Sequence, residues 1–298
     1  MNRRAFLAGA AGGIAGCSRL RRSQQIVDGS AIDLGGSRAD AACPGSQFQP
    51  PSNTLFFGVR GQSNSGGRAA LVPGDNGIQP NQYLYTNLGR WEPAQMVYSA
   101  SGYPDNSVGG YGRYSTDDAT LFWYGFHKAF AERIIALTGR PVGFVINSKT
   151  SKIEDWDWTV QNNTSIYYKS FKRFRNVPLH GIVWHQGEGN RLDDFNANPY
   201  TPKLKALFER FRLDEQPAPG VTTIPIVCGG ITKNPNGVPG GGDAVNAQIA
   251  AIVGQLPAVA FASSETPSVL TTFDGLHFDR ASYDALGTRL ADAMAPML

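Results

Sequence analysis

The sequence predicts a three-layer α/β/α domain, in which helices cover both faces of a five-stranded and mainly parallel sheet. Five short apolar runs of strand length alternate along the chain with segments of helical periodicity. That alternation is typical of parallel strands joined by right-handed crossovers. The 298-residue chain also shows no internal repeat and no second block of composition. We therefore expect a single folded domain over residues 54–298.

The five predicted strands share apolar and β-branched residues, with glycine, proline or polar residues at their ends. They are Thr54–Arg60, Val142–Ile146, His180–Trp184, Thr223–Cys228 and Ala258–Ala262.

Five helices are predicted from apolar residues at helical spacing. The clearest is Ala119–Thr138, whose broad apolar face is followed by Gly139 and Pro141, two residues that end helices. The others are Ser165–Asn176, Pro199–Leu213, Asp243–Gln255 and Asp279–Met297.

A long region rich in glycine, proline and asparagine lies between Asn64 and Thr116. It contains two short strand-like pieces, Gln82–Thr86 and Gln95–Tyr98. Loops of that length inside a compact domain usually carry function. We expect this region to form part of a binding rim.

The composition is that of a folded protein without the features of a nucleic-acid-binding one. Hydrophobic residues make up 41% and charged residues 17% of the chain, which excludes wholesale disorder. The net charge is only +3, and no basic stripe with interleaved aromatic residues is present. We expect no nucleic-acid partner.

Residues 1–17 are predicted to be an export signal. Arg3 and Arg4, followed by Phe6 and Leu7, resemble a twin-arginine signal, and the apolar segment is shorter than the ~20 residues of a membrane-spanning helix. Ile14-Ala-Gly-Cys17 resembles a bacterial lipobox, which would make Cys17 a lipidated residue. A plain signal peptide with an incidental cysteine is the alternative. We expect an exported bacterial protein, either periplasmic or anchored to the membrane through Cys17.

Residues 18–53 have no sustained periodicity and are predicted to be a flexible tether. Cys228 lies in an apolar run and is most simply a buried thiol. A Cys43–Cys228 disulfide is the alternative in an oxidising compartment, and the sequence does not decide between the two.

Polar motifs follow several of the predicted strands. Ser63 follows the first strand and Gln186 the third, while Asp274 and His277 lie beyond the last. Because the carboxyl ends of parallel strands meet at one edge of a sheet, we expect these four side chains to come together. Acyl transfer needs a hydroxyl, an imidazole that takes its proton, a carboxylate that fixes the imidazole tautomer, and donors to an oxyanion. The sequence therefore predicts a serine hydrolase site.

Three motifs, in this order, resemble those of the SGNH (GDSL-type) hydrolases. They are Gly61-Gln-Ser-Asn64, Trp184-His-Gln-Gly-Glu188 and Asp274-Gly-Leu-His-Phe278. They are most similar to the branch that holds sialic acid O-acetylesterases and the acetylxylan esterases of carbohydrate esterase family six. The resemblance implies a flavodoxin-like fold and an esterase that removes O-acetyl groups from a carbohydrate.

The resemblance also assigns roles to individual residues. Ser63 would be the nucleophile, His277 the base and Asp274 the orienting acid. The Ser63 backbone N–H and the Gln186 side-chain amide would bind the oxyanion. Glu188 is expected to hold the Gln186 loop through backbone hydrogen bonds, with a second catalytic acid as the alternative.

The chain departs from the family pattern after the second strand, where the family has a glycine-rich turn that donates an N–H to the oxyanion. Here Lys149 and Thr150 take the places of the glycines. A backbone N–H at Thr150 would still donate, but a β-branched residue is disfavoured where φ must be positive. Loss of one such donor typically lowers turnover by ~10²–10³-fold.

Alternative functions remain at this point. A carbohydrate-binding surface lipoprotein with a decayed hydrolase site is one, motivated by Lys149 and Thr150; a lipase-like esterase is another. No group of His, Cys and acidic residues has zinc spacing, and neither an EF-hand nor a phosphate-binding loop appears. We predict no metal, no cofactor, a monomer, and an acetylated carbohydrate as substrate.

Overall fold

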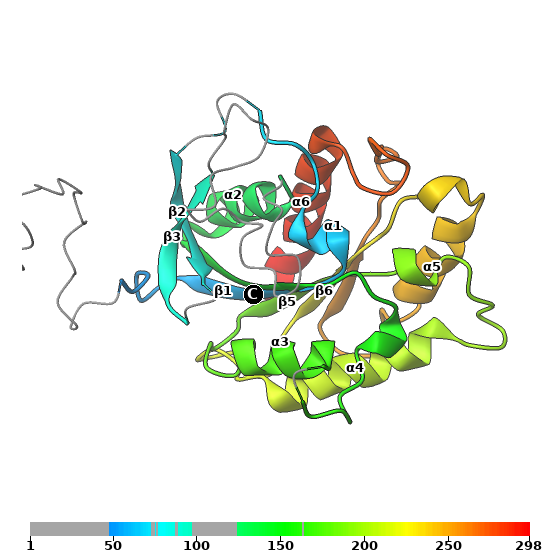
Figure 1. Ribbon diagram of the computed structural model, residues 1–298. Helices are drawn as coiled ribbons and strands as arrows, with labels where there is room; N and C mark the ends of the chain where they lie inside the picture. The colour runs from blue at the N-terminus through cyan, green and yellow to red at the C-terminus, as the bar shows by residue number, and fades with distance from the viewer. Residues whose placement is uncertain (1–47, 73–74, 76, 87–88, 97–123, 163) are drawn as a thin grey trace, which may run out of the picture. The chain divides into compact units, whose positions relative to one another are not determined.

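A seven-stranded sheet forms the centre of the folded unit, Ser46–Leu298 (Figure 1). The computed structural model describes residues 48–72, 75, 77–86, 89–96, 124–162 and 164–298. Across the sheet the strands lie in the order β3 (Trp91–Met96), β2 (Gly77–Tyr85), β4 (Val142–Ser148), β1 (Leu55–Gly61), β5 (Gly181–His185), β6 (Ile226–Gly229) and β7 (Val259–Ala262). Neighbouring strands are parallel except β2 and β3, which are antiparallel.

The five predicted strands correspond to β1, β4, β5, β6 and β7. Numbered along the chain, they lie in the order second, first, third, fourth, fifth, which is the flavodoxin-like order. Ligands of such sheets bind outside the carboxyl ends of the strands where the order reverses. In this fold that position lies at the carboxyl ends of β1 and β5.

Helices cover both faces of the sheet, so the predicted three-layer fold is confirmed (Figure 1). One face carries α2 and α6 and the other carries α3, α4 and α5. Their bounds are α2 (His127–Thr138), α3 (Ile166–Phe174), α4 (Tyr200–Asp214), α5 (Gly241–Ala250) and α6 (Arg280–Met294). Short helical turns lie at α1 (Ser63–Gly66), Ile153–Asp155, Glu188–Asn190, Pro235–Gly237 and Ala295–Met297.

Two hydrophobic cores lie on either side of the sheet, because successive side chains of a strand point to opposite faces. In β5, Val183 belongs to the core beneath α2 and α6, whereas Ile182 and Trp184 belong to the core beneath α3, α4 and α5. The central strands are buried on both faces and therefore appear in the sequence as continuous apolar runs.

Helix starts agree with their capping residues. The side chain of Ser165 accepts a hydrogen bond from the Tyr168 N–H, and that of Asp279 accepts one from the Ser282 N–H. The first predicted helix is shorter than expected, because α2 begins at His127 and Tyr124 instead forms a bridge with Ala69. Residues 119–123 of that prediction lie outside the described residues.

The prediction of five strands was wrong by two, because β2 and β3 extend the sheet beyond β4. The sequence of β2, GIQPNQYLY, has little apolar periodicity. It contains Asn81 at φ +59° and a register irregularity between Ile78 and Tyr83. Only Gln82–Leu84 pair with β4. A bulged strand of this kind gives a weak sequence signal.

Several predictions concern residues outside the described ones, namely the export signal with Cys17, most of the tether, and Cys43. Cys228 is a free thiol and is fully buried. In the part of the chain that the structure describes, no helix has both the length and the apolar character needed to cross a membrane.

Candidate active site

Ser63 lies at the carboxyl end of β1, where the strand turns into α1. Gly61 allows this turn: its φ is +143°, and a Cβ there would lie 1.8 Å from the carbonyl oxygen of His185. Glycine is therefore required where β1 and β5 approach each other. Gln62 is the N-cap of α1 and Ser63 its first residue, with 5% of its surface exposed.

The structure brings the Ser63 hydroxyl, the His277 imidazole and the Asp274 carboxylate into one hydrogen-bonded line. His277 Nε2 lies 2.9 Å from Ser63 Oγ, and His277 Nδ1 lies 2.7 Å from Asp274 Oδ2. The other carboxylate oxygen of Asp274 accepts hydrogen bonds from the N–H groups of Leu276 and His277, at 2.9 and 2.7 Å. Three side chains spread over more than two hundred positions thus meet as a serine hydrolase requires.

The same hydrogen bonds keep Asp274 ionised. Partial burial opposes the charged form, but hydrogen bonds from the His277 backbone, the His277 ring and the Leu276 backbone outweigh it and lower the pKa of Asp274 below its ordinary value. An ionised Asp274 accepts the Nδ1 proton of His277, which leaves the Nε2 lone pair facing Ser63.

Gln186 does not lie where the resemblance placed it. Its side chain is fully buried, and its amide nitrogen donates to Gln62 Oε1, the Ser151 carbonyl and Asn190 Oδ1, at 3.1, 3.1 and 2.9 Å. Its amide oxygen accepts from the Tyr200 hydroxyl at 2.6 Å. The expectation that Gln186 binds an oxyanion is therefore corrected, because its donors are already used within the protein.

Gln62 is the residue that sequence reasoning missed. Its amide oxygen accepts three hydrogen bonds, from Gln186 Nε2 at 3.1 Å and from the Gly187 and Gly189 N–H groups at 3.2 Å each. These donors fix the orientation of the amide, so that its nitrogen is the free end beside Ser63. Among the described residues, no acceptor bonds this nitrogen. An amide directly preceding the serine at a strand end was the signal available in the sequence.

A glycine again makes this arrangement fit. Gly187 has φ +152°, and a Cβ there would lie 2.5 Å from a methyl carbon of Val245. The backbone between Gln186 and Glu188 can therefore turn its N–H groups toward Gln62 only if residue 187 has no side chain.

The Ser63 N–H is a further free donor. It opens α1, and the first N–H groups of a helix have no acceptor within the helix. Within the described part of the chain, no acceptor outside α1 bonds it either. The Ser63 N–H and the Gln62 amide nitrogen therefore belong to adjacent residues at the same strand end.

Thr150 lies two residues beyond β4, on an exposed part of the neighbouring loop. It is not among the described non-glycine residues with positive φ, so the strain foreseen for a β-branched residue does not arise. The Lys149 N–H is already bonded to the Gly61 carbonyl at 3.0 Å. Of the two residues that replace the family's glycines, only Thr150 offers a backbone donor.

Glu188 is buried and contacts a side chain rather than the loop backbone that was expected. Its Oε1 accepts a hydrogen bond from Asn64 Nδ2 at 2.6 Å, whereas the nearby N–H groups of Gly187 and Gly189 go to Gln62. His185 is also fully buried, and its Nε2 lies 3.2 Å from the Gly230 carbonyl. Neither side chain is hydrogen-bonded to Ser63, so we assign both to the support of the site.

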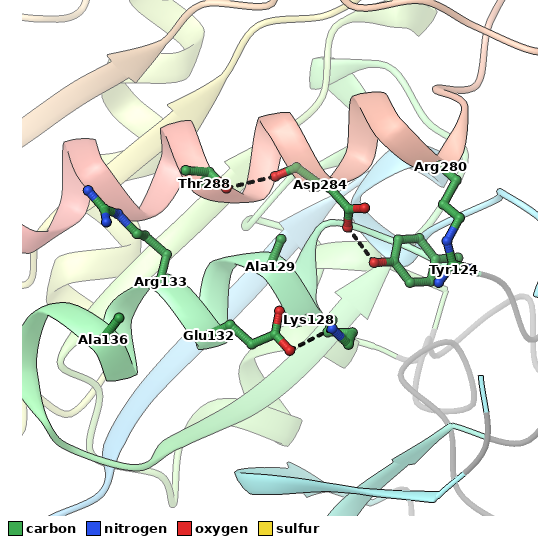
Figure 2. Close-up of a pocket in the computed structure, with 9 residues that line it drawn as sticks. All are labelled: Tyr124, Lys128, Ala129, Glu132, Arg133, Ala136, Arg280, Asp284 and Thr288. Atoms are coloured by element: carbon green, nitrogen blue, oxygen red, sulfur yellow. Dashed lines mark hydrogen bonds and ion pairs between the residues drawn. The ribbon is translucent and has the colours of Figure 1, made fainter. Parts of the chain in front are cut away.

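An open groove of about 470 Å³ lies between α2 and α6 (Figure 2). Among its charged groups, Lys128 pairs with Glu132, Arg133 pairs with Asp292, and the Asp284 carboxylate accepts a hydrogen bond from the Tyr124 hydroxyl. Arg280 pairs with Asp75 outside the figure. None of Ser63, Asp274 and His277 lines this groove. Among the described residues, no group of three or more His, Cys, Asp or Glu side chains is placed to hold a metal ion.

Comparison with known proteins places the chain in relation to a family model and to solved structures. Residues 53–296 match the family model described as carbohydrate esterase, sialic acid-specific acetylesterase. No curated protein matches the chain.

Solved structures resemble the chain in fold. A protein from Arabidopsis thaliana has a TM-score of 0.63 at 20% identity, covering 83% of this chain and 99% of its own. NanS has a TM-score of 0.55 at 14% identity, with 84% and 98% covered. A carbohydrate acetylesterase from Xanthomonas citri has a TM-score of 0.51 at 19% identity, and the match covers 80% of this chain but 55% of that one. At these identities the likeness establishes the fold.

Proposed function

The chain belongs to the family of carbohydrate esterases described as sialic acid-specific acetylesterases, and we propose that it removes O-acetyl groups from a carbohydrate through an acyl-enzyme on Ser63. Family membership makes it a carboxylic ester hydrolase. The proposal of an acyl-enzyme on Ser63 rests on two hydrogen bonds. His277 Nε2 lies 2.9 Å from Ser63 Oγ, and His277 Nδ1 lies 2.7 Å from Asp274 Oδ2.

In the first half-reaction, Ser63 Oγ attacks the acetyl carbonyl carbon while His277 Nε2 takes the hydroxyl proton. The tetrahedral intermediate then breaks its bond to the sugar oxygen, which takes the proton from His277 and leaves as an alcohol. The acetyl group stays on Ser63 as an ester. In the second half-reaction, a water gives its proton to His277 and attacks that ester. Acetate leaves, and the proton returns to Ser63.

The negative charge that develops on the carbonyl oxygen needs fixed donors. We assign this role to the Ser63 N–H and the Gln62 amide nitrogen, with the Thr150 N–H as a third donor. Gln186 has a supporting role: it donates a hydrogen bond to Gln62 Oε1, which leaves the Gln62 nitrogen as the end of that amide that can donate to the substrate. The two glutamines thus divide the side-chain role that the resemblance gave to Gln186, beside the Ser63 N–H.

Acetate release from a panel of acetylated sugars tests the proposed function. The panel compares O-acetylated sialic acid, xylan and other acetylated polysaccharides, with Ser63→Ala as the matched control. The proposal expects acetate from at least one of them, and none above background from the control. A preference for long acyl chains over acetyl would instead indicate a lipase-like esterase.

Export is a separate proposal, which rests on residues 1–17. We propose that the protein is carried out of the bacterial cytoplasm and anchored through a lipid on Cys17. Cell fractionation of the native chain and of Cys17→Ala tests this. Movement of the variant from the membrane to the soluble exported fraction supports lipidation, and an unchanged location contradicts it.

A further inference from the structure

Asn64, the residue after Ser63, is fully buried, and both ends of its side-chain amide are occupied. Its nitrogen donates to Glu188 Oε1 at 2.6 Å and to the Leu276 carbonyl at 3.1 Å. Its oxygen accepts from the Tyr283 hydroxyl at 2.6 Å and from the Phe278 N–H at 3.3 Å. An amide nitrogen has two hydrogens and an amide oxygen two lone pairs, so all four positions are used.

Two of these bonds flank His277. The Leu276 carbonyl belongs to the peptide group before His277, and the Phe278 N–H to the peptide group after it. One side chain therefore holds the backbone on both sides of the base, and it belongs to the residue beside the nucleophile. The loop from Phe273 to His277 is otherwise exposed or partly exposed, with Phe273 55% exposed, and its Gly275 carbonyl accepts a hydrogen bond from the Asn236 N–H at 2.7 Å.

The remaining two bonds fix which way the Asn64 amide faces. The Glu188 carboxylate accepts only from the nitrogen end, and Tyr283 is placed to donate to the oxygen end. Both partners are buried, at 1% and 0% exposure. A flipped amide would put its oxygen against the carboxylate, so the amide cannot turn without leaving buried groups unpaired.

We propose that Asn64 is a positioning residue that sets the distance between His277 Nε2 and Ser63 Oγ. The inference rests on the proposed function and adds to it how the base is held. Asp274 orients the imidazole ring from within its own loop, whereas Asn64 ties that loop to α1. Glu188 and Tyr283 in turn fix the orientation of the Asn64 side-chain amide.

Asn64→Asp is the sharpest variant, because it keeps the shape and replaces a donor by an acceptor. The new oxygen faces the Leu276 carbonyl and the Glu188 carboxylate, so the loop loses the hydrogen bond that holds its backbone directly before His277. A displacement of about 1 Å in a catalytic group can cost ~10²-fold in rate. We therefore expect kcat to fall about 10²-fold, while KM, which reflects contacts elsewhere, stays nearly unchanged.

A double-mutant cycle with His277→Ala separates positioning from other roles. If Asn64 acts through His277, Asn64→Asp has no further effect on kcat once the imidazole is gone. The same fold-loss in both backgrounds would overturn the inference, since Asn64 would then act independently of the base. An unchanged kcat in the single variant would overturn it as well.

Tyr283→Phe provides a milder variant in case Asn64→Asp fails to fold. It removes one donor to Asn64 Oδ1, and we expect kcat to fall about five-fold, as for one lost hydrogen bond. Tyr167→Phe is the matched control, because it removes the hydroxyl of another buried tyrosine that bonds Asp214 at 2.6 Å, in the other core. Equal loss of kcat in both would overturn the inference.

Crystal structures of Asn64→Asp and Tyr283→Phe give a readout that needs no turnover. We expect the Ser63 Oγ to His277 Nε2 distance to exceed hydrogen-bonding range in Asn64→Asp. A distance still near the 2.9 Å of the native protein would overturn the inference even in an active enzyme. A native protein that releases no acetate from any sugar would count against the proposed function instead, and the structures would still decide the role of Asn64.

Discussion

The side-chain oxygen of Gln62 accepts a hydrogen bond from the side-chain nitrogen of Gln186 at 3.1 Å. This contact joins the motif after β1 to the motif after β5, at the point in the sheet where the strand order reverses. The two amides also have different roles. Gln186 is fully buried and its nitrogen is used within the protein, whereas the nitrogen of Gln62, the residue before Ser63, bonds no acceptor among the described residues. We therefore assign the contact with the substrate oxyanion to Gln62 and a supporting role to Gln186.

Gln62→Ala is expected to lower kcat by about 10²–10³-fold, the usual effect of removing one oxyanion donor. KM should change little, because the donor acts on charge that develops only in the transition state. Steady-state kinetics on an acetyl ester measures this. Gln186→Ala, the matched control, should lose less kcat and more thermal stability; if it loses as much kcat as Gln62→Ala while folding normally, the division of roles is wrong.

Asp274→Asn should nearly abolish turnover while leaving the fold intact. Its amide would retain the oxygen that accepts from the Leu276 and His277 backbone, and would turn its NH₂ group toward His277 Nδ1. The imidazole proton then moves to Nε2 and blocks proton transfer from Ser63. The corresponding change in a serine protease costs ~10⁴-fold. Kinetics checks the rate; a loss below about tenfold would mean that Asp274 does not set the tautomer.

The lowered pKa of Asp274 also predicts a pH dependence of stability. The pKa of a carboxyl group that is lower in the folded than in the unfolded state adds stability at pH values above the unfolded pKa. That stability is lost as the pH falls through the folded pKa, below the ordinary 3.8. Thermal unfolding from neutral to acidic pH should therefore show a steeper acid loss in the native protein than in Asp274→Asn. If the native protein and Asp274→Asn lose thermal stability in parallel as the pH falls, folding does not lower the pKa of Asp274.

Phe273 should contribute modestly to the rate. Its ring is stacked on the His277 imidazole with centroids 6.1 Å apart, and an aromatic face attracts the imidazolium that forms during catalysis. Exposed cation–π contacts contribute about 0.5–1 kcal/mol, so Phe273→Leu should lower kcat about two- to five-fold and Phe273→Tyr should retain it. Equal kcat values for the two variants would exclude this contribution.

The fold was predictable from sequence where strands are buried on both faces. The runs at Leu55–Val59 and Gly181–Trp184 are apolar throughout because each contacts both cores. The pair β2 and β3 was not predicted as part of the sheet. In β2, Ile78 is 62% exposed, and Pro80 and Asn81 interrupt its pattern.

The site was predictable where a residue adjoins the end of a strand or a compact motif, as Ser63, Asp274 and His277 do. The roles of the two glutamines were not, because they depend on which way an amide faces. That direction is set by Ser151, Asn190 and Tyr200. These three residues contact Gln186 only once the loops have folded together, so no local sequence pattern predicts the contacts.

A buried ion pair between Arg60 and Glu215 should be costly to break. Both side chains have no exposed surface, and the guanidinium lies 4.0 Å from the ring centres of Phe174 and Phe211. Removing one partner of such a pair typically costs about 3–5 kcal/mol. We expect Glu215→Ala to lose stability of that order in denaturant unfolding. The double variant Arg60→Met with Glu215→Leu should be more stable than Glu215→Ala, and the opposite order would contradict this account.

The central claim is that Ser63 carries the acetyl group between the two half-reactions. Mass spectrometry of peptides from enzyme quenched in acid during turnover of an activated acetyl ester tests it directly. The account predicts one acetyl group on the peptide that contains Ser63, and neither that adduct nor acetate release in Ser63→Ala. Acetate release that persists in Ser63→Ala, or turnover with the acetyl group on a different residue, would contradict it.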